Sequence, residues 1–323
     1  LKKNNKKVVL CHGVFDILHL GHIEYFKEAK NYGHILVVSI TENKFVNKLF
    51  GKFKYIIIEK PLSLNLHETK ELYSNFKISK TICASGLNRH YDTFLKVVKK
   101  DIQDEFIGQV HSVYYYGFHK GSKNEKQFSK EMEYQQGNLV IGGLVHKFEQ
   151  LNFLFGHPID IMARVVSKTH EDVGTHYFIT ISYEKNIICN INYKEDNGIT
   201  FGEKLEIYTK NGQINVNHNS KCVDYVVNEF FGPISLKKII HKLYSIVRGY
   251  KFDISKNRRI IKKFKFNHGS IKNILDEIEK KNNKENCDLV GMEQNYLTTM
   301  MSLACQKSIK TSKIINIDEF IRT

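Results

Sequence analysis

The chain contains a string with two histidines that are placed where they could bind phosphate. It reads His12-Gly13-Val14-Phe15-Asp16-Ile17-Leu18-His19-Leu20-Gly21-His22, and it lies between an apolar run at 8–11 and a stretch of helical spacing at 21–32. Glycine at a strand exit lets the backbone approach a phosphate, and the first turn of a helix presents unpaired amides with a partial positive charge. His19 and His22 can donate hydrogen bonds to the same oxygens. This order of residue types favours phosphoryl chemistry.

The pattern GxFDxxHxGH, followed by an amphipathic helix and a second apolar strand, resembles the cytidylyltransferase-like nucleotidyltransferases, in particular those acting on glycerol phosphate or sugar phosphates. The resemblance reaches about Lys48. It implies that CTP with Mg²⁺ binds here and that the histidines stabilise charge at the α-phosphorus while a substrate phosphate attacks. It implies catalytic roles for His19 and His22 and nucleotide binding by Gly13, Phe15, Asp16, His19, Gly21, His22 and Lys48. A lone histidine pair at a helix start would instead indicate surface caps.

A second set of candidate residues begins at Glu59-Lys60-Pro61, which ends an apolar strand expected at 55–58. Asn88-Arg89-His90-Tyr91 follows, and Gly142-Gly143-Leu144-Val145-His146 then precedes a series of strands. This order is similar to that of the Gfo/Idh/MocA-type sugar oxidoreductases, over roughly residues 52–323. In that family the Glu-Lys-Pro segment closes the dinucleotide-binding half, and a large antiparallel sheet forms the substrate half.

The second resemblance implies an NAD(P) cofactor, with Lys60 near the nicotinamide and a sugar hydroxyl and with His146 as the acid/base. It places Arg89, Tyr91 and Glu149 at the substrate. A lysine beside a cationic ring in a partly buried site can have its pKa lowered toward neutrality, which the removal of a hydroxyl proton requires. Without the resemblance, Lys60 is a solvated lysine at a strand end and His146 is a satisfied histidine on a buried helix.

The chain departs from the second family at three points. Gly142 stands where the family has Asp four residues before the histidine, and Glu149 stands where it has Asp three residues after it. No GxGxxG fingerprint for the cofactor pyrophosphate occurs upstream of Glu59. Since only residues 49–58 separate the two resemblances, we interpret the chain as a fusion of two enzymes whose middle is missing.

The elements that must position these residues fall into two kinds. Continuous apolar runs alternating with helical stretches predict a parallel sheet covered on both faces, with strands at 8–11, 35–40, 55–58 and 80–84 and helices at 21–32 and 64–76. From about Val110 the pattern predicts an antiparallel meander with strands at 110–116, 160–167, 176–183, 187–193, 204–209 and 213–216. Further elements are expected as helices at 236–247, 271–280 and 292–305 and a strand at 314–317.

The expected fold class is therefore α/β, Rossmann-like, followed by an α+β domain with a large, mainly antiparallel sheet. We expect residues 1–50 to be a partial cytidylyltransferase-like segment and residues 51–105 to be a remnant of a dinucleotide-binding domain that shares one sheet with it. Residues 106–323 are expected to be a Gfo/Idh/MocA-like domain for substrate binding and oligomerisation.

The composition restricts the class of protein. The 323 residues are 41% hydrophobic and 26% charged, which excludes a disordered chain. The net charge is +15, but the lysines are dispersed and form no nucleic-acid-binding motif, so we expect small phosphate or sugar substrates and no nucleic acid. No apolar run is long enough to span a bilayer. The six cysteines show neither a Cys-x-x-Cys motif nor zinc spacing, so we expect reduced thiols, no metal site and a cytoplasmic protein.

The leading hypothesis is a nucleotidyltransferase that transfers CMP from CTP to a polyol or sugar phosphate and is fused to an oxidoreductase-like domain. The first alternative is an NAD(P)-dependent sugar oxidoreductase, which must bind its cofactor without the glycine fingerprint. The second alternative is a catalytically dead remnant whose antiparallel sheet binds a ligand or forms a homo-oligomer. Binding measurements with CTP and with NADH separate the three.

Overall fold

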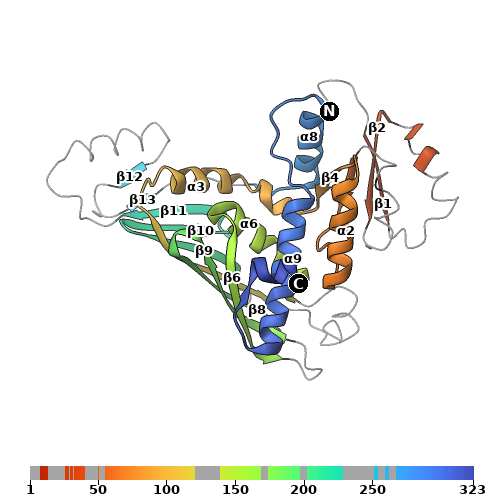
Figure 1. The fold of residues 1–323 in the computed structure, drawn as a ribbon. Coiled ribbons are helices and arrows are strands. Elements are labelled where there is room, and N and C mark those ends of the chain that lie inside the picture. Colours follow the sequence, from red (N-terminus) through yellow and green to blue (C-terminus); the bar gives the residue numbers. More distant parts are fainter. Residues whose placement is uncertain are drawn as a thin grey trace. The chain divides into compact units, whose positions relative to one another are not determined.

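Figure 1 shows a computed structural model of the chain. The structure describes residues 8–13, 26–28, 30–31, 33–40, 50, 55–120, 139–168, 174–196, 202–227, 251–253, 259–261 and 267–323. Contacts divide the chain into two compact units. The first unit takes residues 1–91, 134–150 and 268–304, and the second takes residues 92–133, 151–267 and 305–323.

The first unit contains a four-stranded parallel sheet. Its strands, in sheet order, are β1 (Val8–Gly13), β2 (Ile35–Ile40), β3 (Tyr55–Ile58) and β4 (Ile82–Ser85). Each neighbouring pair runs parallel. Ile56, Ile57 and Ile58 are successive residues of β3 and are all buried, as expected for a parallel strand covered on both faces. The α/β part of the predicted fold class is confirmed.

Helices and short turns surround this sheet in the chain order. They are α2 (Leu66–Ile78), the 3-10 turn η3 (Asn88–Tyr91), α5 (Leu139–Gly142), the start of α6 (Val145–Phe155), α8 (Ile271–Asn282) and the first part of α9 (Met292–Thr311). Residues 26–28 and 30–31 are also helical. The Asn65 side chain caps α2 by accepting from the Glu68 amide at 2.8 Å, which explains why the helix begins there.

The core of the first unit joins segments that are far apart in the sequence. Its buried residues are Val37, Ile57, Ala84, Leu87, Tyr91, Val145, Ile274, Ile278 and Val290. They come from β2, β3, β4, η3, α6, α8 and the segment before α9. The late segment also extends the hydrogen bonding of β4, because the Ser85 amide donates to the Val290 carbonyl at 2.8 Å. This core fixes η3 and the start of α6, which carry candidate site residues.

The second unit contains a ten-stranded mixed sheet in the order β12-β13-β11-β10-β9-β5-β8-β7-β6-β14. Its strands are β5 (Val110–Lys120), β6 (Pro158–Lys168), β7 (Gly174–Tyr183), β8 (Ile187–Asp196), β9 (Gly202–Thr209), β10 (Gly212–Asn217), β11 (Cys222–Val227), β12 (Lys251–Asp253), β13 (Arg259–Ile261) and β14 (Ile315–Asn316). The large, mainly antiparallel sheet of the predicted fold class is confirmed.

The strand order differs from a simple meander. The turn signal at Asp196-Asn197-Gly198 predicts that β8 and β9 pair with each other, but β5 lies between them, parallel to β8 and antiparallel to β9. The signal at Lys210-Asn211-Gly212 does join paired neighbours, β9 and β10. Local turn chemistry therefore predicted one hairpin correctly and missed the insertion of a strand from earlier in the chain.

Alternation along the central strands gives this sheet a buried face and an open face. Val113, Tyr115 and Ile179 belong to the buried face, whereas Phe178 and Tyr114 are 44% and 36% exposed. The register places both exposed rings on one face, because successive side chains of a strand point to opposite sides. The second unit also contains α3 (Thr93–Gln103), the 3-10 turn η5 (Glu184–Asn186) and α10 (Ile317–Arg322).

Some sequence predictions fall elsewhere. The helix expected at 236–247 lies outside the described residues, and the strand expected at 314–317 is reduced to β14, because Ile317 already begins α10. None of the described helices is long and apolar enough to cross a membrane. Where the structure describes their side chains, the cysteines are free thiols: Cys83, Cys189, Cys222, Cys287 and Cys305.

Candidate active site

The predicted nucleotide corner lies at the carboxyl end of β1, where the structure describes one of its residues. Gly13 is the last residue of β1 and pairs with Ile40 of β2. Loops at the carboxyl ends of parallel strands are the usual place for nucleotide phosphates. The other predicted residues lie outside the described ones: Phe15, Asp16, His19, Gly21, His22 and Lys48. Their roles remain predictions.

Lys60 leaves the end of β3 and turns toward the chain that leads into α6. Its ammonium Nζ donates a hydrogen bond to the Gly142 carbonyl oxygen at 2.7 Å. Burial lowers the pKa of Lys60, and the negative charge of Glu59 opposes this shift. A lysine with a lowered pKa has a larger neutral fraction, so its amine can accept a proton more readily than an ordinary lysine.

The neighbouring Glu59 is held from two sides. Its carbonyl oxygen accepts from Asn295 Nδ2 at 3.2 Å. Its carboxylate lies over Gly86, where an added Cβ would come within 2.6 Å of Glu59 Oε2. A side chain at position 86 would displace this carboxylate, so glycine is required by the close approach. These contacts fix the backbone from which Lys60 projects.

The turn η3 carries Arg89 and Tyr91, two residues predicted at the substrate. The Arg89 guanidinium donates to Nδ1 of His268. Tyr91 is buried, and its hydroxyl accepts from the Val290 amide at 3.2 Å. Burial raises the pKa of Tyr91. The structure thus places Tyr91 in the hydrophobic core of the first unit, and its predicted contact with substrate remains untested.

His146 and Glu149 lie three residues apart near the start of α6, and therefore on one side of the helix. His146 is half-buried, whereas Glu149 is 3% exposed. The carboxylate of Glu149 accepts from Nδ1 of His90 at 2.5 Å. Glu149, predicted at the substrate, is therefore also the partner of a histidine in η3.

His90 was not assigned a role from the sequence, although it stands between Arg89 and Tyr91. Its second nitrogen, Nε2, lies 3.3 Å from Oδ2 of Asp288. Burial lowers the pKa of His90, but the hydrogen bonds to Asp288 and Glu149 outweigh burial and raise it to about 9. His90 is therefore an imidazolium at neutral pH. Its partners are 59 and 198 positions away in the chain, which is why no local pattern could reveal them.

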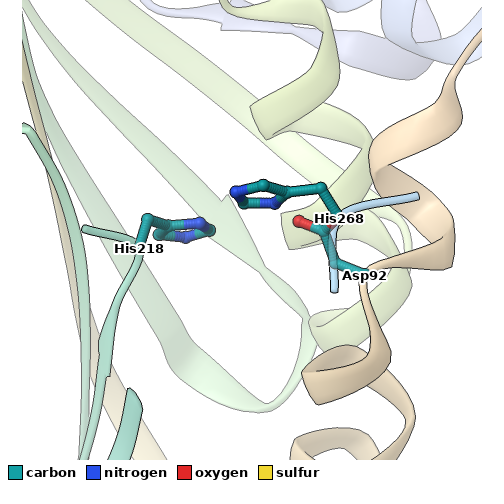
Figure 2. Close-up of side chains that lie close together, drawn as sticks. All are labelled: Asp92, His218 and His268. Atoms are coloured by element: carbon teal, nitrogen blue, oxygen red, sulfur yellow. The ribbon is translucent and has the colours of Figure 1, made fainter. Parts of the chain in front are cut away.

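A second buried histidine lies in the second unit. Asp92, just before α3, and His218, just after β10, are both buried, and a carboxylate oxygen of Asp92 lies within 4.8 Å of a ring nitrogen of His218 (Figure 2). On the other side of the ring, Nδ1 of His218 lies 3.8 Å from Oε2 of Glu203. Carboxylate and imidazole are common metal ligands, but two of them do not define a coordination site.

Comparison with known proteins finds two family models on the chain. Residues 10–61 match the cytidylyltransferase-like family, and residues 95–215 match the GFO/IDH/MocA C-terminal domain. The first match contains all seven predicted nucleotide-binding residues and ends at Glu59-Lys60-Pro61. The second contains His146 and Glu149. Both predicted resemblances are confirmed.

Curated relatives match the first segment. The bifunctional protein HldE of Campylobacter jejuni is 46% identical over 52 residues, which are 16% of this chain and 11% of that protein. HldE of Geobacter metallireducens is 40% identical over 58 residues. The chain thus spans about a tenth of the length of these relatives, so their likeness concerns this segment alone.

Solved structures match nearly the whole chain in fold. A protein of Desulfitobacterium hafniense classed as an NADPH-dependent oxidoreductase aligns with a TM-score of 0.70 at 15% identity, covering 98% of this chain and 91% of its own. An oxidoreductase of Agrobacterium radiobacter, solved with NAD⁺, L-tartaric acid and magnesium, aligns with a TM-score of 0.65 at 11% identity, covering 96% and 91%. The chain therefore has the fold of these oxidoreductases.

Proposed function

We propose that the chain is an NAD(P)-dependent oxidoreductase of a sugar or polyol, with Lys60 and His146 as its proton-transfer residues. The observation that carries the proposal is the half-buried Lys60, whose Nζ reaches the Gly142 carbonyl and whose pKa is lowered by burial. The fold shared with oxidoreductases solved with NAD⁺ or NADH supports it.

The residues around Lys60 fit the reacting end of such a cofactor. Oxidation of a secondary alcohol removes a hydride from carbon and a proton from the hydroxyl, and NAD(P)⁺, when bound, supplies the hydride acceptor. Lys60 in its neutral form takes the hydroxyl proton, and His146, on the helix that follows Gly142, exchanges that proton with water. Arg89 and Glu149 are the proposed substrate contacts in this scheme. The pyrophosphate end must be bound by the corner after β1, because the chain has no glycine fingerprint.

Equilibrium dialysis with NADH and NADPH tests the first requirement, and wild-type protein should retain one of them. Absorbance of NADH formed from NAD⁺ with a panel of sugars and polyols then tests turnover. Lys60→Met should keep the cofactor and lower turnover by about 10²–10⁴-fold, because it removes a general base. Lys80→Met changes an exposed lysine and serves as the matched control. Absence of any retained dinucleotide would refute the proposal.

A second candidate function, nucleotidyl transfer from CTP to a polyol or sugar phosphate, is favoured by the match over residues 10–61. In this proposal His19 and His22 contact the triphosphate, Gly13 lets the backbone approach it, and Mg²⁺ accompanies the nucleotide. The remaining nucleotide-binding positions are those predicted above. The 46% identity over 52 residues with a bifunctional HldE protein supports a nucleotide corner at this end of the sheet.

A thermal-shift titration with CTP and Mg²⁺ tests the second candidate. CTP with Mg²⁺ should raise the unfolding temperature of the wild type, since a ligand that binds only the folded state stabilises it. His19→Ala should abolish the shift, whereas His67→Ala, at an exposed position of α2, should leave it intact. A shift that survives His19→Ala would mean that CTP binds elsewhere.

We also propose that the open face of the large sheet joins two copies of the chain. Tyr114, Phe178 and Ile188 are exposed on this face, and the register places them together. Exposed apolar side chains on a sheet are typical of association surfaces. Light scattering should give the mass of a dimer for the wild type and of a monomer for Phe178→Glu. A monomeric wild type would refute this part of the proposal.

A further inference from the structure

We infer that His90 and Glu149 are positioning residues for His146, because their contact attaches the start of α6 to the η3 turn. The inference rests on the proposed oxidoreductase function, in which His146 is the proton-exchanging group. It assigns to His90 a role that its neighbours Arg89 and Tyr91 do not share.

The attachment is made at two points on α6. Nδ1 of His90 donates to Oε1 of Glu149 at 2.5 Å, and Nε2 of Gln150 donates to the carbonyl oxygen of Arg89 at 3.3 Å. His90, Glu149 and Gln150 are at most 5% exposed. A charge-assisted hydrogen bond in such a dry environment is strong and directional. One turn of α6 is therefore fixed to η3 by side chains of both elements.

The segment before α6 is held in turn by the other proposed catalytic residue. Lys60 donates to the carbonyl of Gly142, the last residue of α5 and four positions before His146. His146 consequently lies between two fixed points, Gly142 on one side and Glu149 on the other. A proton-transfer group needs such support, because a misplacement of about 1 Å can cost a large share of the rate.

The third member, Asp288, holds His90 from the opposite side. Its Oδ2 lies 3.3 Å from Nε2 of His90, and its side chain is 40% exposed, in contrast to that of Glu149. The Asp288 amide donates to Oε2 of Glu277 at 2.6 Å, so α8 fixes the segment that carries Asp288. With a carboxylate at each ring nitrogen, His90 keeps its proton and cannot rotate without losing both contacts.

A double-mutant cycle on the titration of His146 tests the inference. The ring signal of His146 is followed by NMR in the wild type, His90→Gln, Glu149→Gln and the double variant, and it is assigned with His146→Gln. If the pair acts by positioning, both single variants shift the His146 midpoint in the same direction, by about half a pH unit or more, and the double variant shifts it no further. Glu285→Gln, at an exposed position, should leave the midpoint unchanged.

Opposite shifts for the two single variants, additive shifts, or an unchanged midpoint would overturn the inference, since removal of a cation and of an anion act oppositely through charge alone. If His90→Gln or Glu149→Gln does not fold, Asp288→Asn replaces it, because it weakens the same contact at the exposed partner. Dialysis with NADH is run on the same samples. Lack of NADH retention with a shifted His146 midpoint refutes the proposed function and leaves the positioning role standing.

Discussion

His90 in the first unit and His218 in the second are both buried beside acidic side chains, but their partners lie at different distances. Both ring nitrogens of His90 lie within 3.3 Å of a carboxylate oxygen. Nδ1 of His218 is 3.8 Å from Glu203, and the nearest printed approach to Asp92 is a distance within 4.8 Å (Figure 2). The first ring is held by ionic hydrogen bonds, which require short distances.

The second ring is positioned by the backbone and by packing. The His218 amide donates to the Glu203 carbonyl at 3.0 Å, and the ring packs edge-on against Phe94 with the centroids 5.3 Å apart. The comparison teaches that burial beside carboxylates does not by itself make a histidine an ionic link between elements. The link at His90 depends on two direct contacts from separate segments.

The largest expected effect is that of His90→Gln on stability. The substitution removes a cation from between Glu149 and Asp288, and breaking a buried pair in this way costs about 3–5 kcal/mol of unfolding free energy. Urea denaturation of the variant and the wild type measures the loss. A loss below about 1 kcal/mol would show that the contact carries little of the stability of the first unit.

A pH series sharpens the same comparison. The pKa of His90 is lowered by burial and raised more strongly by Asp288 and Glu149, to about 9, from an ordinary 6.5. A raised histidine pKa stabilises the folded state fully below pH 6.5, and the contribution is lost as the pH rises through 9. It amounts to roughly 3 kcal/mol, since each pKa unit corresponds to about 1.4 kcal/mol.

The groups that face the ring are Glu149 from α6, Asp288 from the segment after α8 and the Tyr91 ring at 5.2 Å. Burial raises the pKa of Tyr91, so it stays neutral in this range. The stability difference between wild type and His90→Gln should therefore shrink between pH 7 and pH 10. A difference that stays constant over this range would contradict the assignment of the proton to His90.

The parallel sheet could be predicted from the sequence, because buried parallel strands are apolar at nearly every position, as in residues 55–58. The order of the large sheet could not, because β5 enters between β8 and β9 and no turn signal records that insertion. Helix α3 was missed for another reason. Its buried Phe94, Leu95 and Val98 alternate with lysines, and the lysines alone suggested a solvated surface.

The candidate site shows the same limit. Lys60 and His146 came from a short motif and a spacing that resemble a family, and the structure adds the hydrogen bond from Lys60 to Gly142. The contact between His90 and Glu149 joins residues 59 positions apart, and periodicity carries no information on such pairs. Local patterns indicated which residue types could do chemistry, whereas the fold determined which of them hold each other in place.

His218→Gln should cost less than His90→Gln. The variant loses the edge-on contact with Phe94 and a weak ionic approach to Glu203, together about 1–2 kcal/mol. Urea denaturation under identical conditions gives the comparison directly. Equal losses for the two variants would mean that burial, and not the distance to the carboxylates, decides the contribution of a histidine in this chain.

His157→Gln gives the smallest expected effect and separates distance from burial. Nε2 of His157 lies 2.9 Å from Oδ1 of Asp318, closer than His218 lies to Glu203, but the two side chains are 46% and 59% exposed. Water screens an exposed pair and competes for its hydrogen bonds, so the pair contributes about 0–1 kcal/mol at most. A loss as large as that of His90→Gln would show that short distance alone is sufficient. A loss near zero would leave the combination of burial and direct contact, found at His90, as the reason that one histidine holds an element in place.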